Sequence, residues 1–210
     1  MKNWKPALLE LAKREGWIIT MDSKGGCPVL ELGAADLDIT KAVHCREKSA
    51  TNNRLIAEEE PDLIIVAQEA AKTIDEIAGS DAVHQKYNAE VESLVESWVV
   101  TGAQVVVIRD VPQTLSTATP ECLEINESNP LVCASDRADA LLSDPFAEAV
   151  VGLEIGDARV VDMSDYFCDD DQCYALIGGL PVNFDERHLS RSYSASLATG
   201  LGEQLLPMLR

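Results

Sequence analysis

The chain has little positive charge for its size. Its 210 residues include 17 lysine and arginine residues against 36 aspartate and glutamate residues, and the formal net charge is -19. The phosphate backbone of a nucleic acid needs a basic counter-surface, and so does an anionic lipid surface. The composition therefore argues against nucleic acid as a partner and against electrostatic docking to a membrane. It indicates a highly soluble, acidic surface.

Long apolar runs are also missing. No stretch approaches the roughly 20 residues that span a bilayer. Charged residues interrupt the start of the chain, where a signal peptide would need an apolar region. The sequence as written therefore predicts neither a transmembrane segment nor an export signal. It contains no repeat, low-complexity tract or linker, and its length fits one domain, which we place at residues 1–210.

The cysteines indicate an oxidising compartment all the same. They fall in three sequence-local pairs, Cys27 and Cys45, Cys122 and Cys133, and Cys168 and Cys173. An even number in this arrangement favours three disulfides, although six cysteines allow many other pairings. A zinc site is the competing interpretation, but the sequence has no C-x-x-C and no histidine at finger spacing. Disulfides without an export signal suggest that the chain is part of something longer, or that its start is misplaced.

The apolar pattern alternates between helical and strand-like segments. Helical spacing predicts helices at 4–15, 53–60, 84–101, 136–151 and 191–207. Short apolar runs predict strands at 17–21, 63–67, 104–109 and 158–162, and one arm of a hairpin at 174–177. Residues 112–133 are rich in turn formers and are expected to form a long loop. Alternating strands and helices predict an α/β sandwich around a mostly parallel sheet.

A carboxylate and an imidazole stand three residues apart near the C-terminus. Asp185 could hold the His188 ring in one tautomer while its second nitrogen takes a proton from a nucleophile. The alternative is that Asp185 helps to cap a helix and His188 is an ordinary surface residue, because D-x-x-H is short and common. The other two histidines, His44 and His84, have no carboxylate at a useful spacing and are expected to face solvent.

An ordered set of motifs runs along almost the whole chain. They are W-x-P-A-L at 4–8, S-K-x-G-C-P at 23–28, P-D-L-I-I-V-A at 61–67, x-D-x-P at 109–112, C-x4-C at 168–173 and D-x-x-H-L-S at 185–190. In this order, together with the cysteines, they resemble the SGNH-type domain fused behind the membrane-embedded acyltransferase-3 domain of bacterial cell-surface O-acyltransferases.

The resemblance implies a flavodoxin-like, three-layer α/β/α domain outside the cytoplasmic membrane. Its activity would be acyl transfer, most often of acetyl groups, or ester hydrolysis on an envelope glycan by serine–histidine–aspartate chemistry. Asp185 and His188 match the family's D-x-x-H. Gly26 matches its oxyanion-hole glycine, and Gln68 stands where the family usually has asparagine; a turn glycine and a strand-end polar residue are the plain alternatives. The implied partners are a glycan and a membrane acyltransferase domain, and no metal or organic cofactor is implied.

One motif of the family is absent from this sequence. The nucleophile lies in a G-D-S-H motif at the end of the first strand, just before the W-x-P-A-L helix, and the chain starts inside that helix. In the strand order 2-1-3-4-5 the first strand separates the second from the third, so we expect a gap in the middle of the sheet. The hypothesis is that this polypeptide lacks a segment of the native gene product. Ser23, Ser190 and Ser192 are poor substitutes for the serine.

Two functional interpretations follow from these observations. The first is a catalytic SGNH domain whose nucleophile is not in this chain. The second is a degenerate, non-catalytic domain that binds envelope glycan or a membrane acyltransferase partner. An unrelated flavodoxin-like binding protein lacks support, since neither glycine-rich phosphate-binding pattern, G-x-G-x-x-G or G-x-x-x-x-G-K-[ST], occurs.

Overall fold

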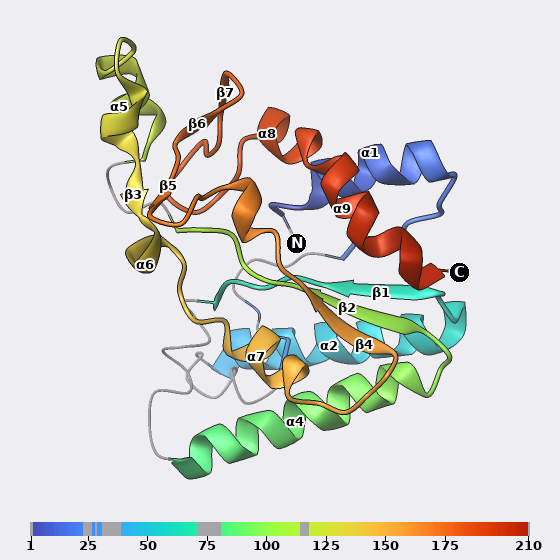
Figure 1. The fold of residues 1–210 in the computed structure, drawn as a ribbon. Helices are drawn as coiled ribbons and strands as arrows, with labels where there is room; N and C mark the ends of the chain where they lie inside the picture. Colours follow the sequence, from blue (N-terminus) through green and yellow to red (C-terminus); the bar gives the residue numbers. More distant parts are fainter. Residues whose placement is uncertain are drawn as a thin grey trace.

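A parallel sheet forms the centre of the domain in the computed structural model, which describes residues 2–22, 27, 29–30, 39–70, 81–113 and 118–209. Its strands are β1 (Leu63–Val66), β2 (Gln104–Ile108) and β4 (Ala158–Val161), in the order β1-β2-β4. Both pairings are parallel (Figure 1). Three of the predicted strands and the α/β class are thereby confirmed.

Helices cover both faces of this sheet (Figure 1). On one face lie α1 (Lys5–Glu15), α8 (Arg191–Ser196) and α9 (Ala198–Leu205). On the other lie α2 (Ile39–Glu59), α4 (Asp81–Val99) and α7 (Pro145–Val151). The predicted three-layer α/β/α arrangement is therefore present.

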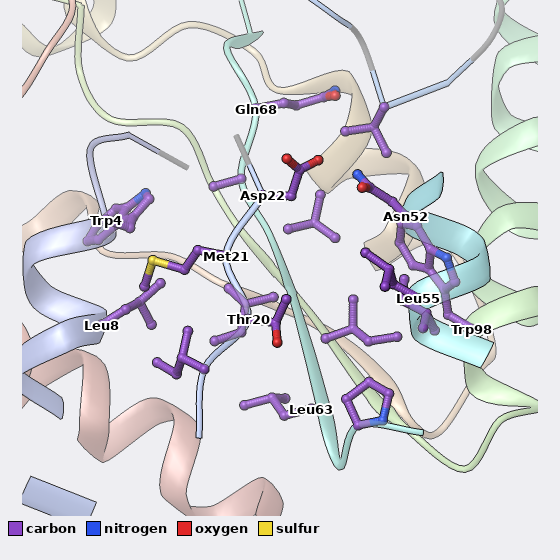
Figure 2. A pocket seen from close by; sticks show the side chains of 18 of the residues that line it. Trp4, Leu8, Thr20, Met21, Asp22, Asn52, Leu55, Leu63, Gln68 and Trp98 are labelled. Carbon is purple, nitrogen blue, oxygen red and sulfur yellow. The ribbon is translucent and has the colours of Figure 1, made fainter. Parts of the chain in front are cut away.

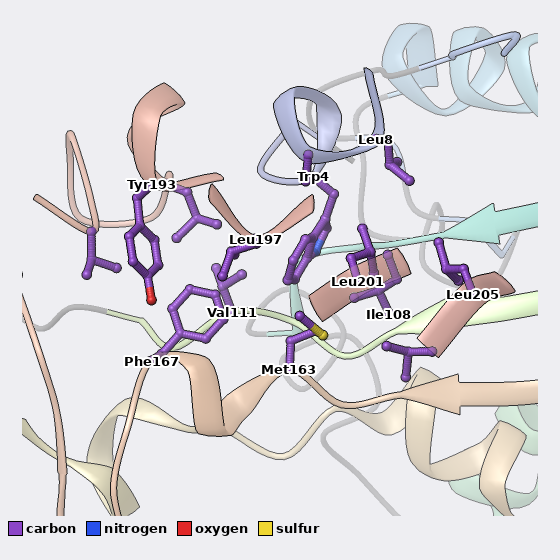
Figure 3. Close-up of a cluster of buried hydrophobic side chains, with 14 of the residues drawn as sticks. Trp4, Leu8, Ile108, Val111, Met163, Phe167, Tyr193, Leu197, Leu201 and Leu205 are labelled. Carbon is purple, nitrogen blue, oxygen red and sulfur yellow. The ribbon is translucent and has the colours of Figure 1, made fainter. Parts of the chain in front are cut away.

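Each face of the sheet has its own apolar core, because side chains alternate along a strand. Val106 and Ile108 of β2 point into the core beneath α1, α8 and α9, whereas Val105 and Val107 point into the core beneath α4 and α7. The first core is built around aromatic rings (Figure 3). Trp4 meets Phe167 edge to face at 6.3 Å between centroids, and Phe167 meets Tyr193 at 5.6 Å.

The predicted strand at 17–21 does not join the sheet. Residues 17–22 have no regular secondary structure, and no strand of the described chain pairs with them. The Ile18 side chain is fully exposed, so the expectation of a buried strand was wrong for this residue. The segment and β1 do not pair, which agrees with the expected gap between the second and third strands. A cavity lies between them, as described below.

Other differences concern where helices begin and end. The helix predicted at 53–60 is the end of α2, which starts at Ile39; its only buried described side chain is Cys45, so it carries little apolar periodicity. The helix predicted at 136–151 is split into α6 (Arg137–Ala140) and α7, because Pro145 starts a new helix. Asp144 caps this second helix by accepting a hydrogen bond from the Ala147 N–H.

The long loop expected at 112–133 carries short helices of its own. They are α5 (Pro120–Ile125) and the 3-10 turn η2 (Pro130–Cys133), joined by a disulfide between Cys122 and Cys133. Cys27–Cys45 and Cys168–Cys173 form the other two disulfides. All three predicted pairs are thus confirmed.

Short strands and turns complete the fold. Two-stranded antiparallel pairs are formed by β3 (Ser135–Asp136) with β5 (Gln172–Cys173), and by β6 (Leu176–Ile177) with β7 (Leu180–Pro181). The second pair is the hairpin that the sequence predicts. The 3-10 turn η3 (Ser164–Tyr166) follows β4, and η4 (Leu206–Leu209) follows α9. In the part of the chain described, no helix is both long and apolar enough to cross a membrane.

Candidate active site

Asp185 and His188 lie in direct contact on the turn between β7 and α8. His188 Nδ1 is 2.8 Å from Asp185 Oδ2 and 3.0 Å from Oδ1. The same Oδ1 accepts hydrogen bonds from the backbone N–H groups of Arg187 and His188, at 2.9 and 2.8 Å. The carboxylate therefore closes its own turn and holds the ring at once. The predicted contact is present, while a catalytic role for the pair stays a prediction.

Opposing effects set the charge state of Asp185. Partial burial raises the pKa of its carboxyl group, but the hydrogen bonds from the Arg187 N–H, the His188 ring and the His188 N–H outweigh burial. The net result is a pKa below the usual value for aspartate. Asp185 is therefore a carboxylate at neutral pH, as a group that orients and stabilises an imidazolium must be.

The turn that carries His188 is fixed from several sides. Asn3 accepts a hydrogen bond from the Leu189 N–H and donates one to the Arg187 carbonyl. The Arg187 guanidinium pairs with Glu69 at 3.0 Å, which ties the turn to the loop after β1. Ser190 caps α8 by accepting a hydrogen bond from the Tyr193 N–H. Contacts far apart in sequence thus set the position of the imidazole.

An exposed aromatic ring lies against His188. The Phe184 ring stacks on the imidazole, with centroids 5.6 Å apart and planes inclined by 21°. The Lys2 ammonium lies 5.7 Å from the centroid of the same Phe184 ring, within the range of a cation–π contact. Half of the Phe184 side chain remains exposed. The site therefore has an imidazole held by Asp185, with an accessible apolar surface beside it.

His188 lines a cavity of about 1820 Å³ that runs along β1 (Figure 2). Gln68 and Asp110, which follow the carboxyl ends of β1 and β2, line it as well. The structure therefore brings Gln68 to the same cavity as His188. Gly26, the other oxyanion candidate, lies outside the described residues.

Asp110 also lines the cavity, although the sequence analysis did not predict it as a site residue and named it only within the x-D-x-P motif. Its carboxylate accepts hydrogen bonds from the N–H groups of Ala70 and Val111, both at 2.9 Å. Burial raises the pKa of Asp110 to about 6, aided by the nearby charges of Asp144 and Glu69 and opposed by the two N–H donors. Asp110 thus fixes the loop after β1 to the end of β2. The x-D-x-P pattern after a buried strand was the available signal.

The serines close to His188 in sequence form hydrogen bonds to the backbone or to each other, not to the His188 ring. Ser190 Oγ donates to the Pro181 carbonyl at 2.5 Å, and Ser192 Oγ lies 3.3 Å from Ser190 Oγ. Ser194 is buried and donates to the Asn3 carbonyl. Ser23 lies outside the described residues. Among those that are described, no hydroxyl group hydrogen bonds to the His188 ring.

The remaining chemistry-bearing side chains are dispersed. His44 and His84 are exposed, as expected. Within the described ranges, no group of three or more histidine, cysteine, aspartate or glutamate side chains is placed to hold a metal ion. The cavity next to Asp185 and His188 is therefore the candidate active site.

A parallel sheet between two helical layers, with an Asp–His pair beyond the carboxyl ends of its strands, defines the class as an α/β/α domain. The family of SGNH domains fused to AT3 domains matches residues 1–201. The chain belongs to that family.

A solved structure supports the fold. The periplasmic domain of the lipopolysaccharide acetyltransferase from Salmonella ser. Paratyphi A superimposes with a TM-score of 0.68. The match covers 97% of this chain and 78% of that one, at 13% sequence identity. At this identity the likeness concerns the fold alone. No curated protein matches the chain.

Proposed function

We propose that the chain is the extracytoplasmic SGNH domain of a cell-envelope O-acyltransferase or esterase. Asp185 and His188 are the orienting acid and the base of its serine–histidine–aspartate mechanism. One observation carries this assignment. His188 Nδ1 is held by both carboxylate oxygens of Asp185. That leaves Nε2 as the nitrogen able to take a proton from a serine hydroxyl in the cavity.

The reaction would proceed through an acyl-enzyme. A serine hydroxyl attacks the acyl carbonyl, His188 takes its proton, and the Asp185 carboxylate stabilises the imidazolium. Donors from the Gly26 N–H and the Gln68 side chain would receive the oxyanion. His188 then protonates the leaving group. Water or a sugar hydroxyl next attacks the acyl-enzyme, which gives hydrolysis or transfer.

The location and partners follow from three observations. The family is fused to AT3 domains, and the structural neighbour is a periplasmic domain of a lipopolysaccharide acetyltransferase. This chain also carries three disulfides, which persist in oxidising compartments. All three support a domain that works outside the cytoplasmic membrane beside a membrane acyltransferase domain. Its substrate would be an acylated or acceptor glycan of the envelope.

A non-catalytic role is the second candidate, and one observation favours it. No hydroxyl group of the described residues hydrogen bonds to His188, so a nucleophile is not assigned within them. A degenerate SGNH domain would use the same cavity mouth and the exposed Phe184 ring to bind glycan. The two candidates differ in whether a serine becomes acylated.

The test begins with the DNA upstream of the Met1 codon and a search for an in-frame G-D-S-H. The extended protein is assayed with p-nitrophenyl acetate, beside variants with that serine changed to alanine and with His188→Ala. His84→Ala is the matched control, because His84 is an exposed histidine on α4. We expect cleavage and an acetylated serine in wild type and in the His84 variant only. Cleavage that survives His188→Ala, or that does not depend on the serine, would refute the mechanism.

A further inference from the structure

The loop after β1 carries two side chains that belong to the surroundings of His188. Gln68 lines the cavity (Figure 2), as His188 does. Glu69 Oε1 accepts a hydrogen bond from the Arg187 guanidinium at 3.0 Å. Because Arg187 directly precedes His188, the position of residues 68–70 bears on both the cavity wall and the turn that carries the imidazole.

The ion pair between Glu69 and Arg187 is too weak to hold this loop by itself. The Arg187 side chain is 58% exposed and the Glu69 side chain 28% exposed. Ion pairs with this much exposure contribute little to stability, because water and salt screen them and two long side chains lose freedom. Another contact must therefore set the position of residues 68–70.

A carboxylate at the end of β2 supplies that contact. Asp110 Oδ2 accepts a hydrogen bond from the N–H of Ala70, the residue after Glu69, and Asp110 Oδ1 accepts one from the Val111 N–H, both at 2.9 Å. Ala70 and Val111 are buried, so water competes little for these N–H groups. Hydrogen bonds to an ionised acceptor are roughly twice as strong as neutral ones. Asp110 therefore outweighs the exposed ion pair in placing the loop.

Asp110 is itself fixed through its backbone. Its N–H donates to Asp144 Oδ2 at 3.0 Å. Asp144 is buried, and its Oδ1 accepts from the Ala147 N–H at the start of α7. Hydrogen bonds thus run from the start of α7 through the end of β2 to the loop after β1. They give Asp110 a defined place from which to hold residues 68–70.

The strength of this link depends on the charge of Asp110. Burial raises the pKa of its carboxyl group to about 6, and the charges of Asp144 and Glu69, which face it, act in the same direction. Arg109, its neighbour in sequence, pairs with Asp162 instead. Both oxygens of Asp110 accept N–H groups, so a proton on either oxygen weakens one of these hydrogen bonds. The loop should therefore be held more tightly above pH 6 than below it.

We propose that Asp110 is a positioning residue of the candidate active site, because it holds residues 68–70 so that Gln68 lines the cavity and Glu69 meets Arg187. Asp110 acts through the backbone of this loop and not on the reacting atoms. Catalytic groups must be held to within about 0.5 Å by such supporting contacts. The consequence for acyl transfer rests on the proposed function, whereas the placement of the loop does not.

The test compares Asp110→Asn with a matched variant at the end of a neighbouring strand. Asparagine keeps the shape of the side chain, but it cannot ionise and has one acceptor oxygen instead of two. The matched variant is Asp162→Asn. Asp162 follows β4 as Asp110 follows β2, and its Oδ1 accepts the Ser164 N–H at 2.9 Å, yet it is not among the residues that line the cavity.

Nuclear magnetic resonance follows three signals as the pH is changed: the Ala70 N–H, the side-chain amide of Gln68 and the guanidinium Nε–H of Arg187. In wild type and in Asp162→Asn, we expect all three to shift with a common midpoint at about pH 6. In Asp110→Asn this midpoint should be absent from all three. It should remain in His188→Ala, because the titration belongs to Asp110 and not to the imidazole.

Two results would overturn the proposal. If only the Ala70 signal has the midpoint, Asp110 closes a local turn and does not position Gln68 or Arg187. If the midpoint survives in Asp110→Asn, or disappears in His188→Ala, another group causes it. Should Asp110→Asn fail to fold, the carboxyl carbon signal of Asp110 is followed in wild type. Its midpoint must then coincide with those of the three signals, and a different midpoint refutes the link.

Kinetics separate this proposal from the proposed function. In a protein that gives serine-dependent cleavage in the assay above, Asp110→Asn should lower kcat by about tenfold or more with little change in KM, since misplaced groups slow the chemical step. The deficit should be largest above pH 6 and shrink below it, whereas Asp162→Asn should behave as wild type. Absence of serine-dependent cleavage in wild type would refute the proposed function and leave the three-signal test of Asp110 intact. An unchanged kcat in Asp110→Asn would refute the positioning role alone.

Discussion

Asn3 and Leu189 are joined by a hydrogen bond in which the Leu189 N–H donates to Asn3 Oδ1 over 3.1 Å. The amide nitrogen of Asn3 also donates to the Arg187 carbonyl at 3.3 Å. One side chain from the amino end thus braces the backbone on both sides of His188. The start of the chain and the Asp–His turn are therefore one structural unit.

Replacing Asn3 by alanine should loosen this unit. Two hydrogen bonds are lost, each with a net worth of about 1 kcal/mol, so the free energy of unfolding should fall by about 1–2 kcal/mol. The measurements are urea denaturation and amide exchange at Leu189. Asn3→Asp is the control, since its carboxylate still accepts from the Leu189 N–H while the donor to Arg187 is lost. If Leu189 exchanges equally slowly in wild type and Asn3→Ala, the brace has no energetic role.

Replacing Asp185 by asparagine should separate its two tasks. The amide oxygen can still accept from the backbone N–H groups of Arg187 and His188, so the turn should persist. The negative charge that holds a proton on His188 Nδ1 is lost, and the tautomer with the proton on Nε2 should gain population. Nitrogen chemical shifts of the imidazole report this directly.

The companion variant is Asp185→Ala, which removes both tasks. Its His188 amide should exchange faster, whereas Asp185→Asn should retain most of the protection. An unchanged tautomer in Asp185→Asn would mean that Asp185 does not orient the ring. In an active, extended protein the asparagine variant should lose about 10⁴-fold in turnover, as expected when the wrong tautomer prevails.

Sequence periodicity predicted the sheet because its strands are short and mostly apolar. The run at 63–67 is entirely apolar and the run at 104–109 is apolar between Gln104 and Arg109, as is typical of strands covered on both faces, whereas Arg159 interrupts the run at 158–162. It failed at 39–52, the first two thirds of α2, where the chain is mostly polar and the pattern has little apolar periodicity. It also failed at Ile18, whose side chain is fully exposed.

The site was predictable only where its residues are neighbours in sequence. Asp185 and His188 form a local motif, so spacing alone suggested their contact. Asn3 and Glu69 reach the same turn from distant positions, and only the tertiary fold brings them there. The raised pKa of Asp110 depends on burial, which a D-x-P pattern does not report. Whether Gln68 acts in catalysis stays a prediction.

The disulfides should differ in how much they stabilise the fold. Cys27–Cys45 closes a separation of 18 residues, whereas Cys168–Cys173 closes one of 5. If disulfides stabilise by lowering the entropy of the unfolded chain, the disulfide that closes the longer loop should stabilise the fold more, by about 1 kcal/mol at room temperature. Replacing Cys27 and Cys45 together by alanine should therefore lower the urea midpoint more than replacing Cys168 and Cys173. The reverse order would show that local packing around the cysteines outweighs loop entropy.

The pH dependence of the free energy of unfolding should show the raised pKa of Asp110. Burial raises the pKa of its carboxyl group from 3.8 to about 6, so the native state binds its proton more tightly than the unfolded chain does. The contribution to stability is fully present below pH 3.8 and is lost as the pH rises through 6. Two pKa units correspond to at most about 3 kcal/mol. Asp110→Asn cannot titrate and should lack this decline.

The measurement compares urea midpoints between pH 4 and pH 7 for wild type, Asp110→Asn and Asp139→Asn. Asp139 is exposed and serves as the matched control for the loss of one carboxylate. We expect the Asp110→Asn protein to be relatively more stable at pH 7 than at pH 4, compared with wild type. The reason is that the buried carboxylate no longer has to be kept charged. Parallel profiles for all three proteins would mean that Asp110 is as well solvated in the native state as in the unfolded chain.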